Sequence, residues 1–263
     1  MIRYKFNIEE AGLELPKNGV ETYTLDSFYP VNYSKSITCN CKKEVIVEIT
    51  SKEETPYMRY LHIYVSHSYF KFSEGSLAMR DILKKVASIY NRIRISISHQ
   101  GEIKSIDNIE ELQEKWKEIK SYIAERYKGE YVERFVQKTD ETLADESKII
   151  EEIASYTHFG LLLKPLYQQY SSEKSIILPQ QLQTRYGKIV VDQKISLTSV
   201  EDTGQVKLNL SAQHPKKEEY INAEESFTFL QQKNSWIESA AISINENYGR
   251  KVYNSNFSII KKS

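Results

Sequence analysis

The sequence is short of cysteine: only two of its 263 residues are cysteines, Cys39 and Cys41. Two cysteines cannot form a disulfide scaffold, and a bond between residues this close along a strand would close a strained loop. A metal site would need two further ligands at suitable spacing, and the five histidines are scattered along the chain. We therefore predict that both cysteines are structural and that the protein holds no metal ion.

Glycine is also scarce, with nine residues, and no glycine-rich motif is present. Phosphate binding by a strand-to-helix loop uses motifs such as GxGxxG or GxxxxGK[ST], because the backbone must approach the phosphate closely. The GxSxG elbow of serine hydrolases is missing as well. Without a catalytic motif, we predict a protein that is not an enzyme and that uses no cofactor.

An excess of charge of either sign is absent, because 36 basic residues balance 36 acidic residues. A protein without a net positive field has no long-range attraction to nucleic acid or to an anionic membrane, so we predict no nucleic-acid partner. Short charged pairs such as Lys42-Lys43 and Glu224-Glu225 are typical of solvated surfaces. We expect both pairs to face water.

No run of about 18 apolar residues, the length that crosses a bilayer as a helix, occurs in the sequence. The first residues, Met1–Phe6, lack the apolar core of a signal peptide. These two absences predict a soluble, cytoplasmic protein without a membrane span, unless a leader peptide has been removed. The frequent Lys, Ile, Tyr and Asn residues are typical of AT-rich genomes and indicate a bacterial source.

What the sequence does contain is a regular alternation of apolar and polar residues, first seen in residues 1–107. Residues 60–65 alternate in the manner of a half-buried β-strand. Apolar residues recur at helical spacing between residues 77 and 90, and a hairpin is predicted over residues 92–106. Region 1–107 is therefore predicted to be β-rich with one helix.

A helical segment follows at residues 108–170, and alternation returns in residues 176–263 with the short spacing of an antiparallel meander. We predict an α+β fold in which two antiparallel β regions flank a central helical block. The two β regions are expected to be separate sheets or parts of one curved sheet or open barrel. We expect a single compact domain, with a candidate internal boundary near the polar turn at 171–176.

The clearest local signal is an amphipathic helix from Asn108 to Tyr127. Its apolar residues recur at steps of three and four: Ile109, Leu112, Trp116, Ile119 and Ile123. Asn108 is predicted to cap the helix with its side-chain oxygen, and Glu111 to complete a capping box. We expect the apolar stripe to be buried against the preceding hairpin as an anchor for the sheet. The alternative is that the stripe is an exposed docking surface.

Tyrosine is abundant, with 19 residues, and its amphipathic ring suits either a core or a partner surface. Tyr60, His62 and Tyr64 share one face of a predicted strand, opposite apolar neighbours. This face is expected to be a wet sheet surface or the inside of a wide barrel, and it is the candidate surface for a partner or a ligand. His67 falls on the other face if the strand is regular.

Neutral charge, abundant tyrosine and missing catalytic motifs favour a non-catalytic protein-interaction component, such as an adaptor, an immunity-type protein or an assembly protein. Such a component would bind another protein through the tyrosine-rich sheet face or the helical block. The alternative is a carrier that encloses an apolar small molecule between a curved sheet and the helices. A cavity of ligand size between these two layers would distinguish the two functions.

Overall fold

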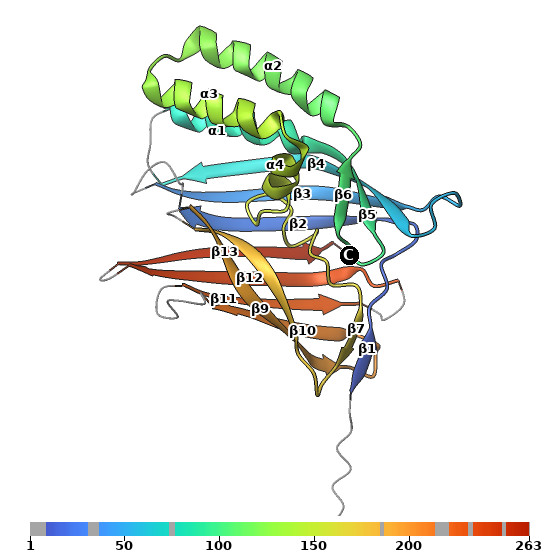
Figure 1. Ribbon diagram of the computed structural model, residues 1–263. Coiled ribbons are helices and arrows are strands. Elements are labelled where there is room, and N and C mark those ends of the chain that lie inside the picture. Colours follow the sequence, from blue (N-terminus) through green and yellow to red (C-terminus); the bar gives the residue numbers. More distant parts are fainter. Residues whose placement is uncertain are drawn as a thin grey trace, which may run out of the picture.

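The structure is a computed structural model that describes residues 9–30, 37–73, 77–184, 187–213, 221–230, 234–248 and 251–262. In these residues the chain forms four α-helices, a sheet of 11 strands and a small sheet of 2 strands (Figure 1). Neighbouring strands of the large sheet pair in antiparallel fashion. The predicted α+β class with antiparallel sheets is therefore confirmed. The expectation about Met1–Phe6 lies outside the described residues.

The strands of the large sheet come from both β regions of the sequence. In order across the sheet they are β6 (Ile103–Ile106), β5 (Arg92–Ser98), β4 (Met58–Phe72), β3 (Thr38–Thr50), β2 (Gly19–Pro30), β13 (Lys251–Lys261), β12 (Ile237–Tyr248), β11 (Ile221–Phe229), β10 (Val206–Gln213), β9 (Gly187–Val200) and β8 (Ile176–Thr184). The two regions join where β13 pairs with β2, with Ile259 opposite Leu25. Of the arrangements left open by the sequence, the structure forms one curved sheet, in which the edge strands β6 and β8 do not pair with each other.

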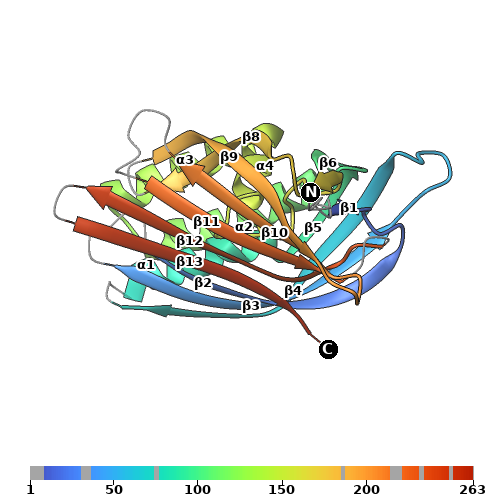
Figure 2. The ribbon, with the colours of Figure 1, turned by 90° about the horizontal axis from the view of Figure 1, so that it is seen from below.

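The helices lie along one side of this sheet, which curves around them (Figure 2). Their bounds are α1 (Leu77–Ala87), the 3₁₀ turn η1 (Ser88–Asn91), α2 (Ile109–Arg126), α3 (Glu130–Leu143) and α4 (Glu146–Ile153). The small sheet pairs β1 (Glu10–Gly12) with β7 (Gln169–Ser171). Among the described residues, none of the helices has the length and apolar character that crossing a membrane requires.

Alternation along the strands gives the large sheet two different faces. In β3, Val45, Val47 and Ile49 are buried on the side of the helices, whereas Ile46 and Glu48 lie on the opposite side. We call the buried side the inner face and the opposite side the outer face. The inner-face residues of most strands join the helices in one hydrophobic core. Each aliphatic side chain that is fully buried in this way stabilises the fold by about 1.5–3 kcal/mol.

The apolar stripe of α2 belongs to the same core. Four of its residues are buried and one is partly buried: Leu112, Trp116, Ile119 and Ile123, with Ile109. The helix neighbours α1, η1 and α3. Its apolar residues share one core cluster with Ile95, Ile97 and Ile106 of the β5–β6 hairpin, and Glu111 in its first turn forms an ion pair with Arg94 of β5. The indole Nε1 of Trp116 donates a 2.7 Å hydrogen bond to Oδ1 of Asp140 on α3. The stripe is therefore buried in the core and is not an exposed docking surface.

The predicted cap of α2 is wrong. The side-chain oxygen of Asn108 accepts no hydrogen bond from α2 and instead accepts one of 2.9 Å from the backbone N–H of Arg94. Its amide nitrogen donates to the carbonyl oxygen of Arg92 at 3.2 Å and to the carboxylate of Glu111 at 3.4 Å. Because β6 ends at Ile106, backbone groups of β5 beyond that point lack a strand partner. The Asn108 side chain, which is itself buried, satisfies these partly buried groups and is therefore not free to cap α2.

Trp116→Ala should destabilise the protein by about 3–5 kcal/mol, because the substitution leaves a cavity in the core and an unpaired Asp140 oxygen. Urea unfolding followed by circular dichroism measures this difference. Glu118→Ala, an exposed position on the same helix, should change stability by less than about 0.5 kcal/mol and is the matched control. A loss below about 1 kcal/mol for Trp116→Ala would contradict the burial of the stripe.

Candidate functional site

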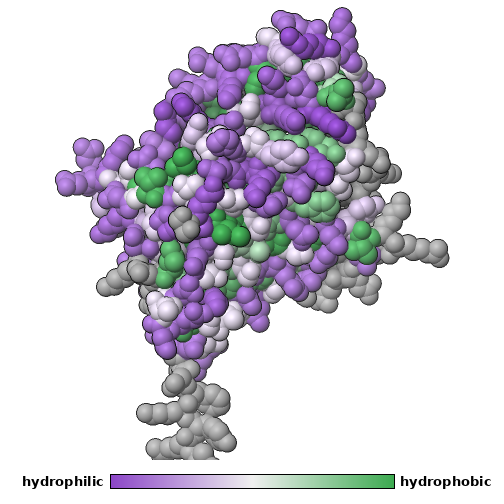
Figure 3. Space-filling view, turned by 180° about the vertical axis from the view of Figure 1, so that it is seen from behind, coloured by the Kyte–Doolittle hydropathy of each residue, from purple (hydrophilic) through white to green (hydrophobic). Residues whose placement is uncertain are grey.

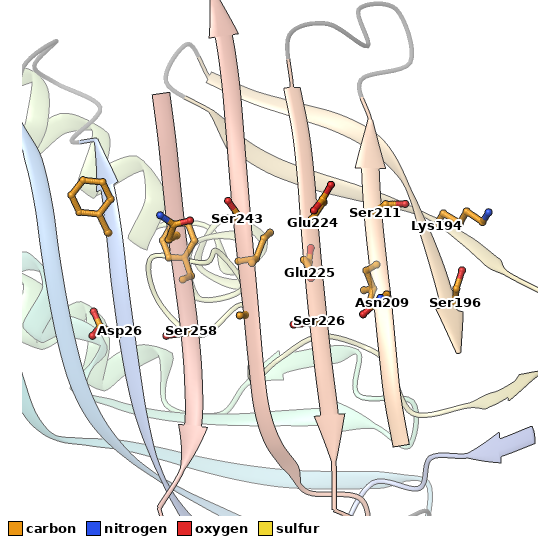
Figure 4. A pocket seen from close by; sticks show the side chains of 16 residues that line it. Asp26, Lys194, Ser196, Asn209, Ser211, Glu224, Glu225, Ser226, Ser243 and Ser258 are labelled. Atoms are coloured by element: carbon orange, nitrogen blue, oxygen red, sulfur yellow. The ribbon is translucent and has the colours of Figure 1, made fainter. Parts of the chain in front are cut away.

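A broad hollow lies on the outer face of the large sheet, across β2, β13, β12, β11, β10 and β9. Its volume is about 680 Å³. The side chains that line it come from two neighbouring rows of cross-strand partners. One row is Asp26, Ser258, Ala241, Ser226, Asn209 and Ser196, and the other is Phe28, Asn256, Ser243, Glu224, Ser211 and Lys194. We call this surface the serine groove (Figure 4).

The serine groove is built from short polar side chains. Most of its outward residues are Ser, Asn or Ala, and they alternate with apolar inner-face residues such as Leu210, Ile242 and Phe257 along the same strands. The ionisable outward residues are few: in Figure 4 Asp26 and Lys194 lie at opposite ends of the rows, and Glu224 lies between them. Short side chains leave the sheet backbone close to the surface, where a second molecule can approach it.

Exposed hydrophobic side chains border the serine groove on the same outer face. Ile260 follows Ser258 along β13 and is 60% exposed, and Ile177 lies opposite Lys194 and is 65% exposed. Val20 and Val190 also project from the outer face into solvent. Figure 3 looks from behind the view of Figure 1 and shows such apolar surface as separate patches among polar surface. The outer face therefore combines hydrogen-bonding groups with apolar contacts.

The candidate row of Tyr60, His62 and Tyr64 lies on this outer face, two strands from β2. Tyr64 stacks near the guanidinium of Arg92, with 5.3 Å between the ring centroid and Cζ, and His62 Nδ1 lies 3.6 Å from the Glu48 carboxylate. The row therefore lies on a solvent-facing sheet surface and not on the inside of a barrel. It lies on the same face as the serine groove but does not line it.

His67 does not fall on the face opposite Tyr64, because the strand is irregular at this point. The pairing of β3 with β4 shifts between Glu44 and Val45, which leaves Ser66 as an extra residue on β4. His67 therefore lies opposite Glu44, an outer-face residue of β3, and is exposed. A β-bulge of this kind cannot be recognised from the alternation of a single strand.

A buried polar cluster lies on the inner face beneath the serine groove, where sequence reasoning expected solvent. Lys164 Nζ lies 2.7 Å from Glu225 Oε2 and 2.7 Å from the Tyr156 hydroxyl oxygen. Tyr156 and Gln193 each donate a hydrogen bond to Glu225 Oε1, at 2.5 Å and 2.6 Å. Burial lowers the pKa of Lys164, and the Glu225 carboxylate opposes this shift. The cluster joins the segment that follows α4 to strands β11 and β9 of the large sheet.

The expectation that Glu225 is solvated is wrong, and the same holds for Lys43. Glu224 and Lys42 are exposed, but Glu225 and Lys43 are buried because they share the strand parity of apolar inner-face residues. Lys43 Nζ donates to the carbonyl oxygen of Thr157 at 3.2 Å. Each of these two charged residues stands two positions from an apolar inner-face residue on its strand. This spacing was the signal in the sequence that could have predicted the burial of Glu225 and Lys43.

Cys39 and Cys41 are free thiols on the inner face of β3, and both are buried. Burial raises the pKa of Cys41 to about 12, although the charge of Lys43 opposes the shift. A thiol with so high a pKa is almost fully protonated at neutral pH and is a poor nucleophile. Among the described residues, no group of three or more His, Cys, Asp or Glu side chains is placed to hold a metal ion.

One small cavity lies between the inner face and the covering segments. The enclosed cavity lined by Tyr23, Leu61, Leu163, Tyr167 and Trp236, among others, has a volume of about 20 Å³. A space of this size holds about one water molecule. This cavity is too small for the apolar ligand that a carrier would enclose, and the observation therefore does not favour that alternative.

Comparison with known proteins adds little to this site. No protein-family model matches the sequence, and no curated protein matches it significantly. A solved structure described as "lipid-protein interactions in lipovitellin" aligns with 94% of this chain, with a TM-score of 0.47 and 11% sequence identity. The aligned part covers 25% of that chain, so this protein spans about a quarter of its length. A likeness this distant defines neither a ligand nor a partner.

Glu225→Gln should destabilise the protein by about 3–5 kcal/mol, because it leaves the Lys164 ammonium buried without a counter-charge. Glu224→Gln changes the adjacent, exposed residue and should alter stability by less than about 0.5 kcal/mol. Urea unfolding of the two variants side by side measures the difference. Equal urea midpoints of unfolding for the two variants would contradict the prediction that Glu225 forms a buried ion pair.

Proposed function

We propose that the protein is a non-catalytic interaction component, of the adaptor, immunity or assembly type, that holds another protein against the outer face of its sheet. The observation that carries this proposal is the serine groove itself. Six neighbouring strands present short polar side chains around a hollow of about 680 Å³, with exposed hydrophobic residues at its border. Helices cover the inner face only, and the described residues leave the groove open.

The size of this surface suits a protein partner. Six strands about 4.8 Å apart and about eight residues long cover roughly 600–800 Å². One partner in a standard protein–protein interface contributes about 800 Å². The groove and its border therefore supply most of one side of such an interface. The row of Tyr60, His62 and Tyr64, on the same face, extends the available area toward β4.

The chemistry of the surface also suits a protein. Serine and asparagine side chains donate and accept hydrogen bonds, so they can pair with backbone and side-chain groups of a partner. Ile260, Ile177 and Phe28 offer apolar contacts around these groups. Because most outward residues of the groove are Ser, Asn or Ala, and the ionisable Asp26, Glu224 and Lys194 are few, we propose a partner surface that is largely uncharged, with polar groups facing the serines and small apolar side chains facing the border.

Site-specific photo-crosslinking in the cells that naturally contain the protein tests this proposal. A crosslinking amino acid at Ser226, in the centre of the groove, should form a discrete protein adduct. The same amino acid at Glu118, on the exposed side of α2, should form none. Ser243→Arg should lower the yield of the Ser226 adduct by at least about tenfold, because a long cation displaces the partner. The free energy of unfolding should stay within about 0.5 kcal/mol of the original value.

An adduct of twice the chain mass identifies a second copy of the chain as the partner, which also supports the proposal. No adduct at Ser226, or the same adducts at Ser226 and Glu118, would contradict it. Native mass spectrometry of the purified protein provides an independent check. A co-purified apolar molecule would favour the carrier alternative instead.

A further inference from the structure

A second cavity, separate from the serine groove, opens at one end of the large sheet. Its volume is about 730 Å³, within the range of roughly 300–1,000 Å³ that is typical of small-molecule sites. Its walls come from five segments that are far apart in the sequence: residues 13–18, Arg59, residues 99–100, residues 167–169 and Asn234. We call this cavity the end cleft. Unlike the groove, it lies between chain segments and not on an open sheet face.

The walls of the end cleft are held in place by backbone hydrogen bonds between the segments that form it. Leu13 N–H donates to Gln168 O at 3.0 Å, and Ser235 N–H donates to Glu14 O at 2.8 Å. Behind the wall, Gly101 has a φ of +91°, and a Cβ atom there would lie 2.9 Å from the Tyr167 ring. Only glycine allows this close contact between the hairpin loop and Tyr167. The cleft is therefore formed before any ligand binds.

Arg59 is the most unusual residue of the end cleft. It lies on the inner side at the start of β4 and is only 8% exposed. Its Nη1 donates to the carbonyl oxygens of Pro56 and Met58, at 2.9 Å and 2.8 Å, while its Nε is buried without a hydrogen-bond partner. No carboxylate among the described residues forms an ion pair with it. A buried charge without a counter-charge is costly, and such charges are ordinarily paired.

We propose that the end cleft binds a small organic carboxylate, whose anionic group lies against Arg59 and supplies the missing counter-charge. The planar guanidinium matches the geometry of a carboxylate and binds it through charge-assisted hydrogen bonds. The cleft is also lined by the amides Asn18, Gln100, Gln168, Gln169 and Asn234 and by the ionisable side chains of Lys17, His99 and Glu14. Amides donate and accept hydrogen bonds, so they suit a carboxylate that also carries hydroxyl or amide groups.

This site does not depend on the proposed function of the outer face. The end cleft and the serine groove share no lining residue. The two proposals are therefore tested by different variants, and the failure of one leaves the other unaffected.

Titration of the full ¹⁵N-labelled chain with succinate tests the proposal, with succinamide as the neutral analogue of the same size, at constant ionic strength. Succinate should shift amide resonances of the cleft segments and bind at least about tenfold more tightly than succinamide, because only the dianion pairs with Arg59. Arg59→Gln should lower the succinate affinity by at least about tenfold. Arg134→Gln, an exposed arginine on α3, should leave the affinity unchanged.

Because Arg59→Gln also alters two backbone contacts, a second variant tests the site without changing Arg59. Gln100→Trp places a large side chain at an exposed position of the cleft wall and should block succinate binding by occupying the space. Equal binding of succinate and succinamide, or unchanged binding in Gln100→Trp, would overturn the proposal. Tighter binding of inorganic phosphate than of succinate would overturn the assignment of a carboxylate. An absence of binding by all three compounds would overturn the proposal as well.

Discussion

The burial of the inner face of the sheet is the constraint on which the rest of the structure depends. An antiparallel sheet with one apolar face is stable when that face is covered. Here the helices and the segment that follows α4 provide the cover, and the sheet curves around them. Because the helices lie on one side only, the outer face of many strands is left open by the part of the chain that the structure describes. The serine groove is a direct consequence of this one-sided arrangement.

The polar cluster of Lys164, Glu225, Tyr156 and Gln193 defines how the covering segment meets the sheet. Apolar contacts tolerate small displacements, whereas a hydrogen-bonded ion pair is satisfied in one arrangement. We infer that the cluster positions the segment from Tyr156 to Tyr167 against β11 and β9. On β11, the residues on either side of Glu225 line the serine groove, and Tyr167 lines the end cleft. One buried cluster thus supports the surroundings of both candidate sites.

Alternate residues of the same strands serve different parts of the molecule. At the start of β4, Arg59 belongs to the inner side and lines the end cleft, while the next residue, Tyr60, belongs to the outer face. The two surfaces differ in kind. The serine groove on the outer face is wide and bears mostly short, uncharged side chains, which suits a protein partner. The end cleft is bounded by several segments around a buried cation, which suits a small anion.

The sequence by itself determined the local elements, including the β5–β6 hairpin, the extent of α2 and its apolar stripe, because periodicity acts between residues close in the chain. It also determined which residues share a face along regular stretches of strand, although the bulge at Ser66 that places His67 on the outer face was not visible in it. Only the tertiary structure decided that β13 pairs with β2, that α2 packs on other helices, and that Glu225 pairs with Lys164, 61 residues away. The end cleft likewise needs five distant segments. Such contacts depend on how the chain folds back on itself, and the pattern within one segment does not contain that information.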